Sequence, residues 1–196
     1  MSEGSPLVPL KEALRRVLGW LDSEGVKGVV IGGVAASLLG RPRATRDVDL
    51  VVWLEDSALE AFVQSAGKHG FEPRMDDVLS FARQSRVLLV RHSDSAIDVD
   101  IALGTLPFEK RAIERRQQCV LGDLTVPLPR AEDLIIMKAV AHRPRDTADV
   151  EALLEANVDV DREYVRRVVG EFASALDTPD LISDLESVLS RIPPEI

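Results

Sequence analysis

The sequence predicts an α/β (α+β) fold in which a sheet is flanked by helices and followed by a helical C-terminal part. Short apolar runs rich in β-branched residues alternate with amphipathic stretches through about Leu128, and from Arg130 onward the apolar residues recur with a helical period. A chain of 196 residues with 45% hydrophobic residues can bury a sizeable core. We therefore expect an α/β core at residues 1–128 and a helical part at 129–196 packed on it.

The elements of the first half follow from periodicity and from the residues that interrupt it. Residues 10–24 are amphipathic with helical spacing, whereas the apolar run at 26–31 is short and β-branched. The stretch from Gly70 to Pro73 ends a further helix. In chain order we expect a helix at 10–24, a strand at 26–31, a short helix after Gly33, a strand from Asp47 and a helix at 59–69.

The second half of the core begins with two runs, 87–91 and 97–103, that a short polar connection joins. We expect them to pair as antiparallel strands. A helix at 107–116 and a short strand at 124–128 complete the core. Helices fill the rest of the chain, with turns at Pro144, at 158–161 and at Pro179.

A glycine pair follows the first predicted strand. Gly32 and Gly33 come directly after an apolar run and precede a short helical stretch. Because they lack a Cβ, they let backbone N–H groups and a helix N-terminus approach a bound anion closely. The pair therefore predicts a phosphate-binding turn.

Two carboxylates open the next predicted strand. Asp47 and Asp49 are two residues apart, so both side chains point to one face, at a spacing of about 6.6 to 6.8 Å. Carboxylates in this arrangement repel each other unless a cation lies between them or one takes up a proton. Mg²⁺ prefers one or two carboxylates together with phosphate oxygens, so Mg²⁺ (or Mn²⁺) with a nucleotide is the favoured interpretation. The alternative is that these acids only face solvent at the start of a strand.

A third carboxylate is expected from a neighbouring strand, and the segment 97–103 is the best candidate. Its apolar residues alternate with acids, so one face is core and the other carries both Asp98 and Asp100. The alternation alone does not choose between the two acids.

These motifs together resemble those of the DNA polymerase beta-like nucleotidyltransferase superfamily, and most closely its small bacterial members related to abortive-infection and toxin-antitoxin nucleotidyltransferases. The shared pattern is Gly-Gly-x-Ala followed by Arg-x-Thr-x-Asp-x-Asp. It is matched by Gly32, Gly33, Ala35, Arg43, Thr45, Asp47 and Asp49. The resemblance implies a mixed sheet flanked by helices. It also implies nucleotide-binding roles for Gly32, Gly33, Arg43, Thr45 and Lys138.

The resemblance favours Asp100 as the third carboxylate, because a glycine and a Pro-Phe-Glu turn follow it as in the family. Asp98 remains its rival. Asp47, Asp49 and Asp100 would then be both catalytic and metal-binding in a two-metal site. Asp100 would activate an acceptor hydroxyl that attacks the α-phosphate, and pyrophosphate would leave.

Lys138 interrupts an apolar helix. Leu134 and Ile135 lie one turn before it, so the lysine cannot simply occupy a polar face. A buried ammonium needs a partner. Lys138 either reaches the triphosphate or a site carboxylate, as the resemblance implies, or it snorkels so that its head reaches water.

Asp146 follows Pro144 in a segment, 142–150, that resembles the Arg-x-x-Asp-x-x-Asp of the same families. It is either the N-cap of the next helix or an accessory site residue, together with Asp98.

Charge and composition limit the binding partners and the cellular location that we expect. A net charge of −9 argues against a broad nucleic-acid-binding surface. The single Cys119 excludes an intrachain disulfide and favours a reducing, cytoplasmic location. The N-terminus does not resemble a signal peptide and no apolar run has membrane-spanning length, so we expect no membrane partner.

The leading function is therefore a two-metal nucleotidyltransferase that moves a nucleoside monophosphate from a nucleoside triphosphate to a hydroxyl of RNA, protein or a small molecule. Its setting would be a toxin-antitoxin or phage-defence system, with a cognate toxin or antitoxin as partner. The alternative is a catalytically silent antitoxin or interaction module with the same fold. A metal-dependent glycosyltransferase is a third hypothesis, against which the glycine pair and the second acidic strand argue.

Overall fold

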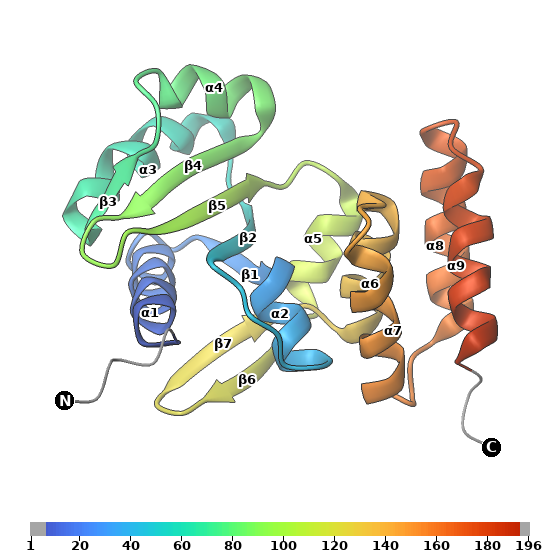
Figure 1. Ribbon diagram of the computed structural model, residues 1–196. Helices are drawn as coiled ribbons and strands as arrows, with labels where there is room; N and C mark the ends of the chain where they lie inside the picture. Colours follow the sequence, from blue (N-terminus) through green and yellow to red (C-terminus); the bar gives the residue numbers. More distant parts are fainter. Residues whose placement is uncertain (1–6, 193–196) are drawn as a thin grey trace. The chain divides into compact units, whose positions relative to one another are not determined.

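In the computed structural model, which describes residues 7–192, the chain forms two compact units (Figure 1). The first comprises the chain up to residue 34 together with 44–128, and the second comprises 35–43 together with the chain from 129 onward. The elements confirm the predicted α/β fold with a mixed sheet and a helical C-terminal part.

The first unit is built on a five-stranded mixed sheet with the strand order β1-β2-β5-β4-β3. Strands β2 and β5 are parallel, and every other pair in this sheet is antiparallel. The strands are β1 (Lys27–Ile31), β2 (Asp47–Trp53), β3 (Phe71–Pro73), β4 (Val87–His92) and β5 (Ile97–Leu103). The predicted strands at 26–31, 87–91 and 97–103 are thus confirmed, as is the strand that begins at Asp47.

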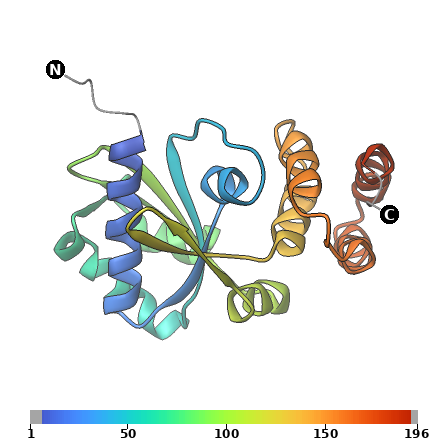
Figure 2. The ribbon, with the colours of Figure 1, turned by 90° about the horizontal axis from the view of Figure 1, so that it is seen from below.

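One face of the sheet carries the core of this unit. Alternate residues of β2, β4 and β5, such as Leu50, Val90 and Ile101, are almost completely buried on it. Helix α1 (Leu7–Ser23), drawn in blue in Figure 2, contacts β2 and β5. Helix α4 (Val78–Ser85) contacts β4. The predicted helix at 59–69 consists of α3 (Leu59–Ser65) and η2 (Ala66–His69) and ends at Gly70, which has φ +81°. The short helix η1 (Asp56–Ala58) precedes it.

The opposite face is acidic at one end and apolar at the other. Val51, Trp53 and Ala102 pack with Ile113 of α5 (Pro107–Glu114). The side chain of Glu109 accepts hydrogen bonds from the backbone N–H groups of the two residues before α5, both at 2.8 Å. This fixes the turn between β5 and α5 and leaves the start of β2 and β5 for the acids.

A hairpin of β6 (Gln117–Leu121) and β7 (Leu124–Leu128) completes the first unit. The sequence predicted β7 but not β6, β3 or α4. Most residues of β6 are exposed, including Val120 at 74%, so this strand lacks the alternation that reveals a half-buried strand.

The second unit is helical. Helix α2 (Gly32–Leu39) starts in the first unit and ends in the second. It is followed by α6 (Ala131–Ala141), α7 (Asp146–Ala156), α8 (Arg162–Ala175) and α9 (Asp180–Arg191). Helix α6 packs against α7 and α8, and α8 lies beside α9 in both views (Figures 1 and 2). None of the helices between residues 7 and 192 is long and apolar enough to span a membrane.

Candidate functional site

The register of β2 and β5 gathers four carboxylates on one face of the sheet. Asp47 lies directly opposite Asp98, and Asp49 lies directly opposite Asp100. Because side chains alternate along a strand, all four point to the same face. The strand that carries Asp98 and Asp100 therefore lies beside the strand that carries Asp47 and Asp49, and the role of either acid as a third site carboxylate stays a prediction.

The turn after β1 is shaped around Asp49. Ile31 pairs with Asp49, and Gly32 follows with φ +61°, in the left-handed region. A Cβ built on Gly32 would lie 1.8 Å from Oδ2 of Asp49 and 2.6 Å from its Cγ. Only glycine leaves room for the carboxylate against this turn. The glycine pair and the first carboxylate pair of the motif are thus parts of one local structure.

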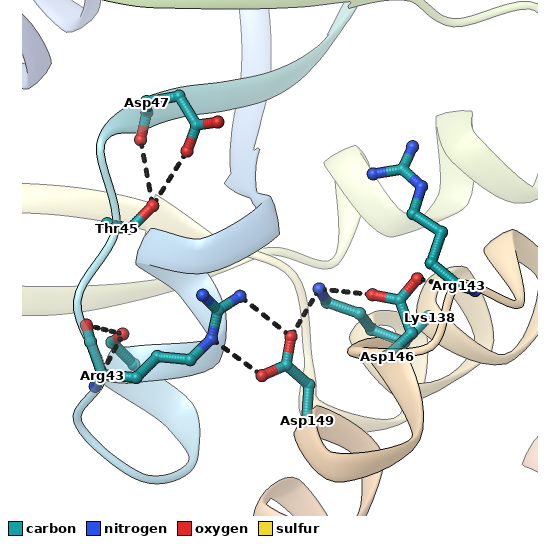
Figure 3. A network of polar contacts seen from close by, with 8 residues as sticks. Arg43, Thr45, Asp47, Lys138, Arg143, Asp146 and Asp149 are labelled. Atoms are coloured by element: carbon teal, nitrogen blue, oxygen red, sulfur yellow. Dashed lines mark hydrogen bonds and ion pairs between the residues drawn. The ribbon is translucent and has the colours of Figure 1, made fainter.

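Thr45 is hydrogen-bonded to Asp47. Its hydroxyl donates to Oδ1 of Asp47 at 2.9 Å, and the backbone carbonyl of Asp47 lies 3.4 Å away (Figure 3). This contact orients the carboxylate of Asp47. The nucleotide-binding role that the resemblance implies for Thr45 stays a prediction.

Asp98 and Asp100 differ in their surroundings. Asp98 is held by two arginines, since Nε of Arg91 lies 2.6 Å from one carboxylate oxygen and Nη1 of Arg74 lies 2.9 Å from the other. Asp100 shares only Arg74, whose Nη2 lies 2.7 Å from Oδ1. That oxygen is buried, and it accepts no well-aligned hydrogen bond from the residues described. Asp98 is therefore paired with two arginines and Asp100 with one, so Asp100 is the better placed of the two to bind a metal ion.

The pKa values of these two carboxyls move in opposite directions. The hydrogen bond from Arg91, with help from Arg74, lowers the pKa of Asp98. Burial raises the pKa of Asp100, and the negative charges of Asp47 and Asp98 raise it further against the opposing pull of Arg74. A carboxyl with a raised pKa beside other acids is typical of functional sites.

The acids fit a divalent metal in chemistry and position. Carboxylate oxygens are the ligands that Mg²⁺ and Mn²⁺ prefer, and Asp49 and Asp100 lie at the same level of two hydrogen-bonded strands. Within residues 7–192, however, no three His, Cys, Asp or Glu side chains already converge as a ligand group. Asp100 is ion-paired to Arg74 instead, so its side chain would have to leave that partner to share an ion with Asp49.

The second unit contains a separate network of buried charges. Nζ of Lys138 donates to Asp146 at 2.8 Å and to Asp149 at 2.7 Å, and the guanidinium of Arg43 forms two hydrogen bonds with Asp149, at 2.8 and 3.0 Å (Figure 3). Lys138 is only 9% exposed. The snorkelling interpretation of Lys138 is therefore wrong, because its head is bound by two carboxylates rather than by water. The nucleotide-binding roles of Arg43 and Lys138 stay predictions.

Asp146 is not the N-cap of α7. The helix begins at Asp146 itself and its N-cap is Arg145. The carboxylate of Asp146 accepts from the backbone N–H of Arg143 at 3.2 Å and from Lys138. Its location in an ion network, and not at a solvent-exposed cap, explains why it is only 5% exposed.

Asp149 is the polar residue of this network that sequence reasoning left out of the candidate site. Burial by itself would raise the pKa of Asp149, but the hydrogen bonds from Arg43 and Lys138 together outweigh it and lower that pKa. The second acid of the Arg-x-x-Asp-x-x-Asp segment was the available signal.

The chain has a nucleotidyltransferase-like fold, which it shares with several solved structures. The structure is similar to the solution structure of the antibiotic-resistance factor ANT(2'')-Ia, with 18% identity, 87% of this chain and 95% of that chain covered, and a TM-score of 0.55. It is also similar to an antigenic nucleotidyltransferase-like protein from Paracoccidioides brasiliensis, with 18% identity, coverage of 89% and 91%, and a TM-score of 0.52. The structure is similar as well to that of the lincosamide antibiotic adenylyltransferase LnuA bound to lincomycin, with 15% identity, 75% of this chain and 97% of that chain covered, and a TM-score of 0.53.

The family is narrower than this fold class. A family model described as the nucleotidyl transferase AbiEii toxin of type IV toxin-antitoxin systems matches residues 19–193, which is most of the chain. The chain therefore belongs to the AbiEii nucleotidyl transferase toxin family, and the resemblance to toxin-antitoxin nucleotidyltransferases is confirmed. Among curated proteins, none matches the chain.

Proposed function

We propose that this chain is a metal-dependent nucleotidyltransferase that moves a nucleoside monophosphate from a nucleoside triphosphate to a hydroxyl acceptor. Two observations carry the proposal. Asp49 and Asp100 lie opposite each other on parallel strands, and Gly32 has no Cβ where one would collide with the carboxylate of Asp49. An acidic pair that only faced solvent would not require a left-handed glycine against it.

Asp47, Asp49 and Asp100 are the residues that would hold Mg²⁺ or Mn²⁺. When bound, such an ion neutralises charge on the triphosphate and lowers the pKa of an acceptor hydroxyl. Thr45 orients Asp47, and Gly32 gives Asp49 its place. Asp98, held by two arginines, is better suited to a supporting role than to coordination.

Asp100 is the residue best suited to accept the proton of the acceptor hydroxyl. It lies opposite Asp49 on a parallel strand, and the side chains of both residues point to the same face of the sheet, so Asp100 can reach a hydroxyl at that site. The acceptor oxygen then forms a bond to the α-phosphorus, the bond to the bridging oxygen breaks, and pyrophosphate leaves with its electron pair. The turn that begins at Gly32 and Gly33 would bind phosphate through backbone N–H groups.

The family supports a role as a toxin, which implies an antitoxin partner. The names of two similar structures, an antibiotic-resistance factor and a lincosamide adenylyltransferase, keep a small molecule among the acceptors beside RNA and protein. The net charge of −9 favours an acceptor that contacts a small area over a long nucleic acid.

The test is label transfer. Purified protein is incubated with each α-phosphate-labelled triphosphate, Mg²⁺ or Mn²⁺, and separate RNA, protein and small-molecule fractions, beside the variant that carries both Asp47→Asn and Asp49→Asn. We expect label in one fraction with the wild-type protein only. Equal labelling by both proteins, or none with any triphosphate and either metal, would contradict the proposal and favour a catalytically silent module.

A further inference from the structure

Arg74 links the two acids of β5. It follows β3 directly, and its guanidinium places Nη1 2.9 Å from Oδ2 of Asp98 and Nη2 2.7 Å from Oδ1 of Asp100. The side chain is 22% exposed. A single arginine thus spans the predicted third metal ligand and its neighbour on the same face of the sheet.

The position of Arg74 is fixed from two directions. Its backbone N–H donates to the carbonyl of Leu89 at 3.2 Å, and Leu89 is the register partner of Asp100. Asp98 is held in turn by Arg91, whose Nε lies 2.6 Å away. Arg74 is therefore held by the backbone of β4 and by an acid that is itself ion-paired to Arg91.

The contact between Arg74 and Asp100 is an ion pair. Oδ1 of Asp100 is buried and has an arginine nitrogen 2.7 Å away, yet it accepts no well-aligned hydrogen bond within the described part of the chain. Arg74 supplies charge to this oxygen without satisfying it. A cation with better geometry can displace the guanidinium from Asp100 while Asp98 keeps it nearby.

We propose that Arg74 is a positioning residue that occupies the third carboxylate in the metal-free protein and competes with the metal for Asp100. Asp98 is the anchor to which Arg74 remains bound when Asp100 is released. This inference rests on the proposed function, because it takes Asp100 as a metal ligand. It assigns to Arg74 and Asp98 a control of metal affinity, and it explains why Asp98 lies beside the site without belonging to the ligand set.

The test measures Mn²⁺ binding directly, from the paramagnetic resonance signal of free Mn²⁺, in the absence of nucleotide. The Arg74→Gln variant should bind Mn²⁺ with a Kd about fivefold lower than the wild type, a change of the size expected when one partly exposed ion pair is lost. Arg91→Gln is the matched control, because it removes the same charge from Asp98 but has no contact with Asp100. Its Kd should stay within about twofold of the wild type.

The failures of the two proposals are distinguishable. If wild-type protein binds no Mn²⁺, or binds it equally after Asp49→Asn, the metal site and this inference both fall. If the wild type binds and Asp49→Asn does not, but Arg74→Gln binds no tighter than the wild type or Arg91→Gln gains as much, only the role of Arg74 is overturned. Should Arg74→Gln not fold, Arg74→Met also removes the charge and gives the same comparison, and an unchanged Kd in that variant also overturns the role of Arg74.

Discussion

Replacing Gly32 by alanine would push a side chain into the carboxylate of Asp49. The backbone at Gly32 has φ +61°, and the new Cβ would lie 1.8 Å from Oδ2, far inside van der Waals contact. Because the new Cβ would also lie 2.8 Å from the Cβ of Asp49, the carboxylate has to move together with the backbone that carries it. We expect Gly32→Ala to remove Asp49 from its position without unfolding the protein.

A second glycine, Gly25, separates the cost of the left-handed backbone from the cost of the clash with Asp49. Gly25 has φ +65°, and an added Cβ would meet nothing within 4 Å. Both substitutions therefore cost the left-handed strain of about 1 to 2 kcal/mol, which is smaller than a typical stability of roughly 5 to 15 kcal/mol. With a urea m-value of about 2 kcal/mol/M, Gly25→Ala should lower the unfolding midpoint by about 0.5 to 1 M, and Gly32→Ala, which adds the clash with Asp49, should lower it by at least as much.

Only Gly32→Ala should affect the site. Mn²⁺ binding and label transfer, measured beside urea unfolding, should fall by at least about tenfold in Gly32→Ala, which corresponds to about 1.4 kcal/mol, and should be unchanged in Gly25→Ala. If Gly32→Ala binds and transfers like Gly25→Ala, then Asp49 does not need its place against this turn, and the reasoning from the glycine is refuted.

Three further predictions concern single side chains. Thr45→Val should weaken Mn²⁺ binding by a few-fold, because it removes one hydrogen bond, worth about 0.5 to 1.5 kcal/mol, that orients Asp47. Thr45→Ser should retain binding, and equal Mn²⁺ affinities in both variants would contradict this role of Thr45. Lys138→Met should destabilise the protein by about 3 to 5 kcal/mol in urea unfolding, since it leaves buried carboxylates without their ammonium, and a loss below about 1 kcal/mol would show the network to be unimportant. Because the pKa of Asp149 is lowered in the folded protein, its carboxylate stabilises the fold above pH about 4, the usual carboxyl pKa, and this contribution is lost as the pH falls through the folded-state pKa. The difference in unfolding free energy between the wild type and Asp149→Asn should therefore shrink below pH about 4. A constant difference down to pH about 2 would contradict this.

The sequence predicted the parts of the site that lie close together in the chain. Asp47 and Asp49 open a strand of β-branched residues, and Asp98 and Asp100 alternate with buried apolar ones, so period and composition agree. The glycine turn was predicted for another reason, because Gly32 and Gly33 lack a Cβ and lie between a strand and a short helix. Only the register of β2 against β5, which sets Asp49 opposite Asp100, required the structure.

The contacts that the sequence did not predict join segments that are far apart in the chain. Arg74 lies after a three-residue strand that contains a proline, a pattern too short to predict, and reaches Asp100 only through the order β3-β4-β5. Arg43 and Asp149 are 106 residues apart. No local pattern pairs such residues, because ion pairs of this kind are fixed by topology and not by period.

The most direct test of the central claim compares label transfer by Asp100→Asn and Asp98→Asn under identical triphosphate, metal and acceptor. The two variants remove one negative charge each from neighbouring positions of the same strand face, and both residues contact Arg74. Asp100→Asn should lose transfer by at least about a hundredfold, as expected when a general base is removed, and Asp98→Asn should retain most of it. Full transfer by Asp100→Asn, with loss in Asp98→Asn, would contradict the assignment of Asp100 as the third carboxylate.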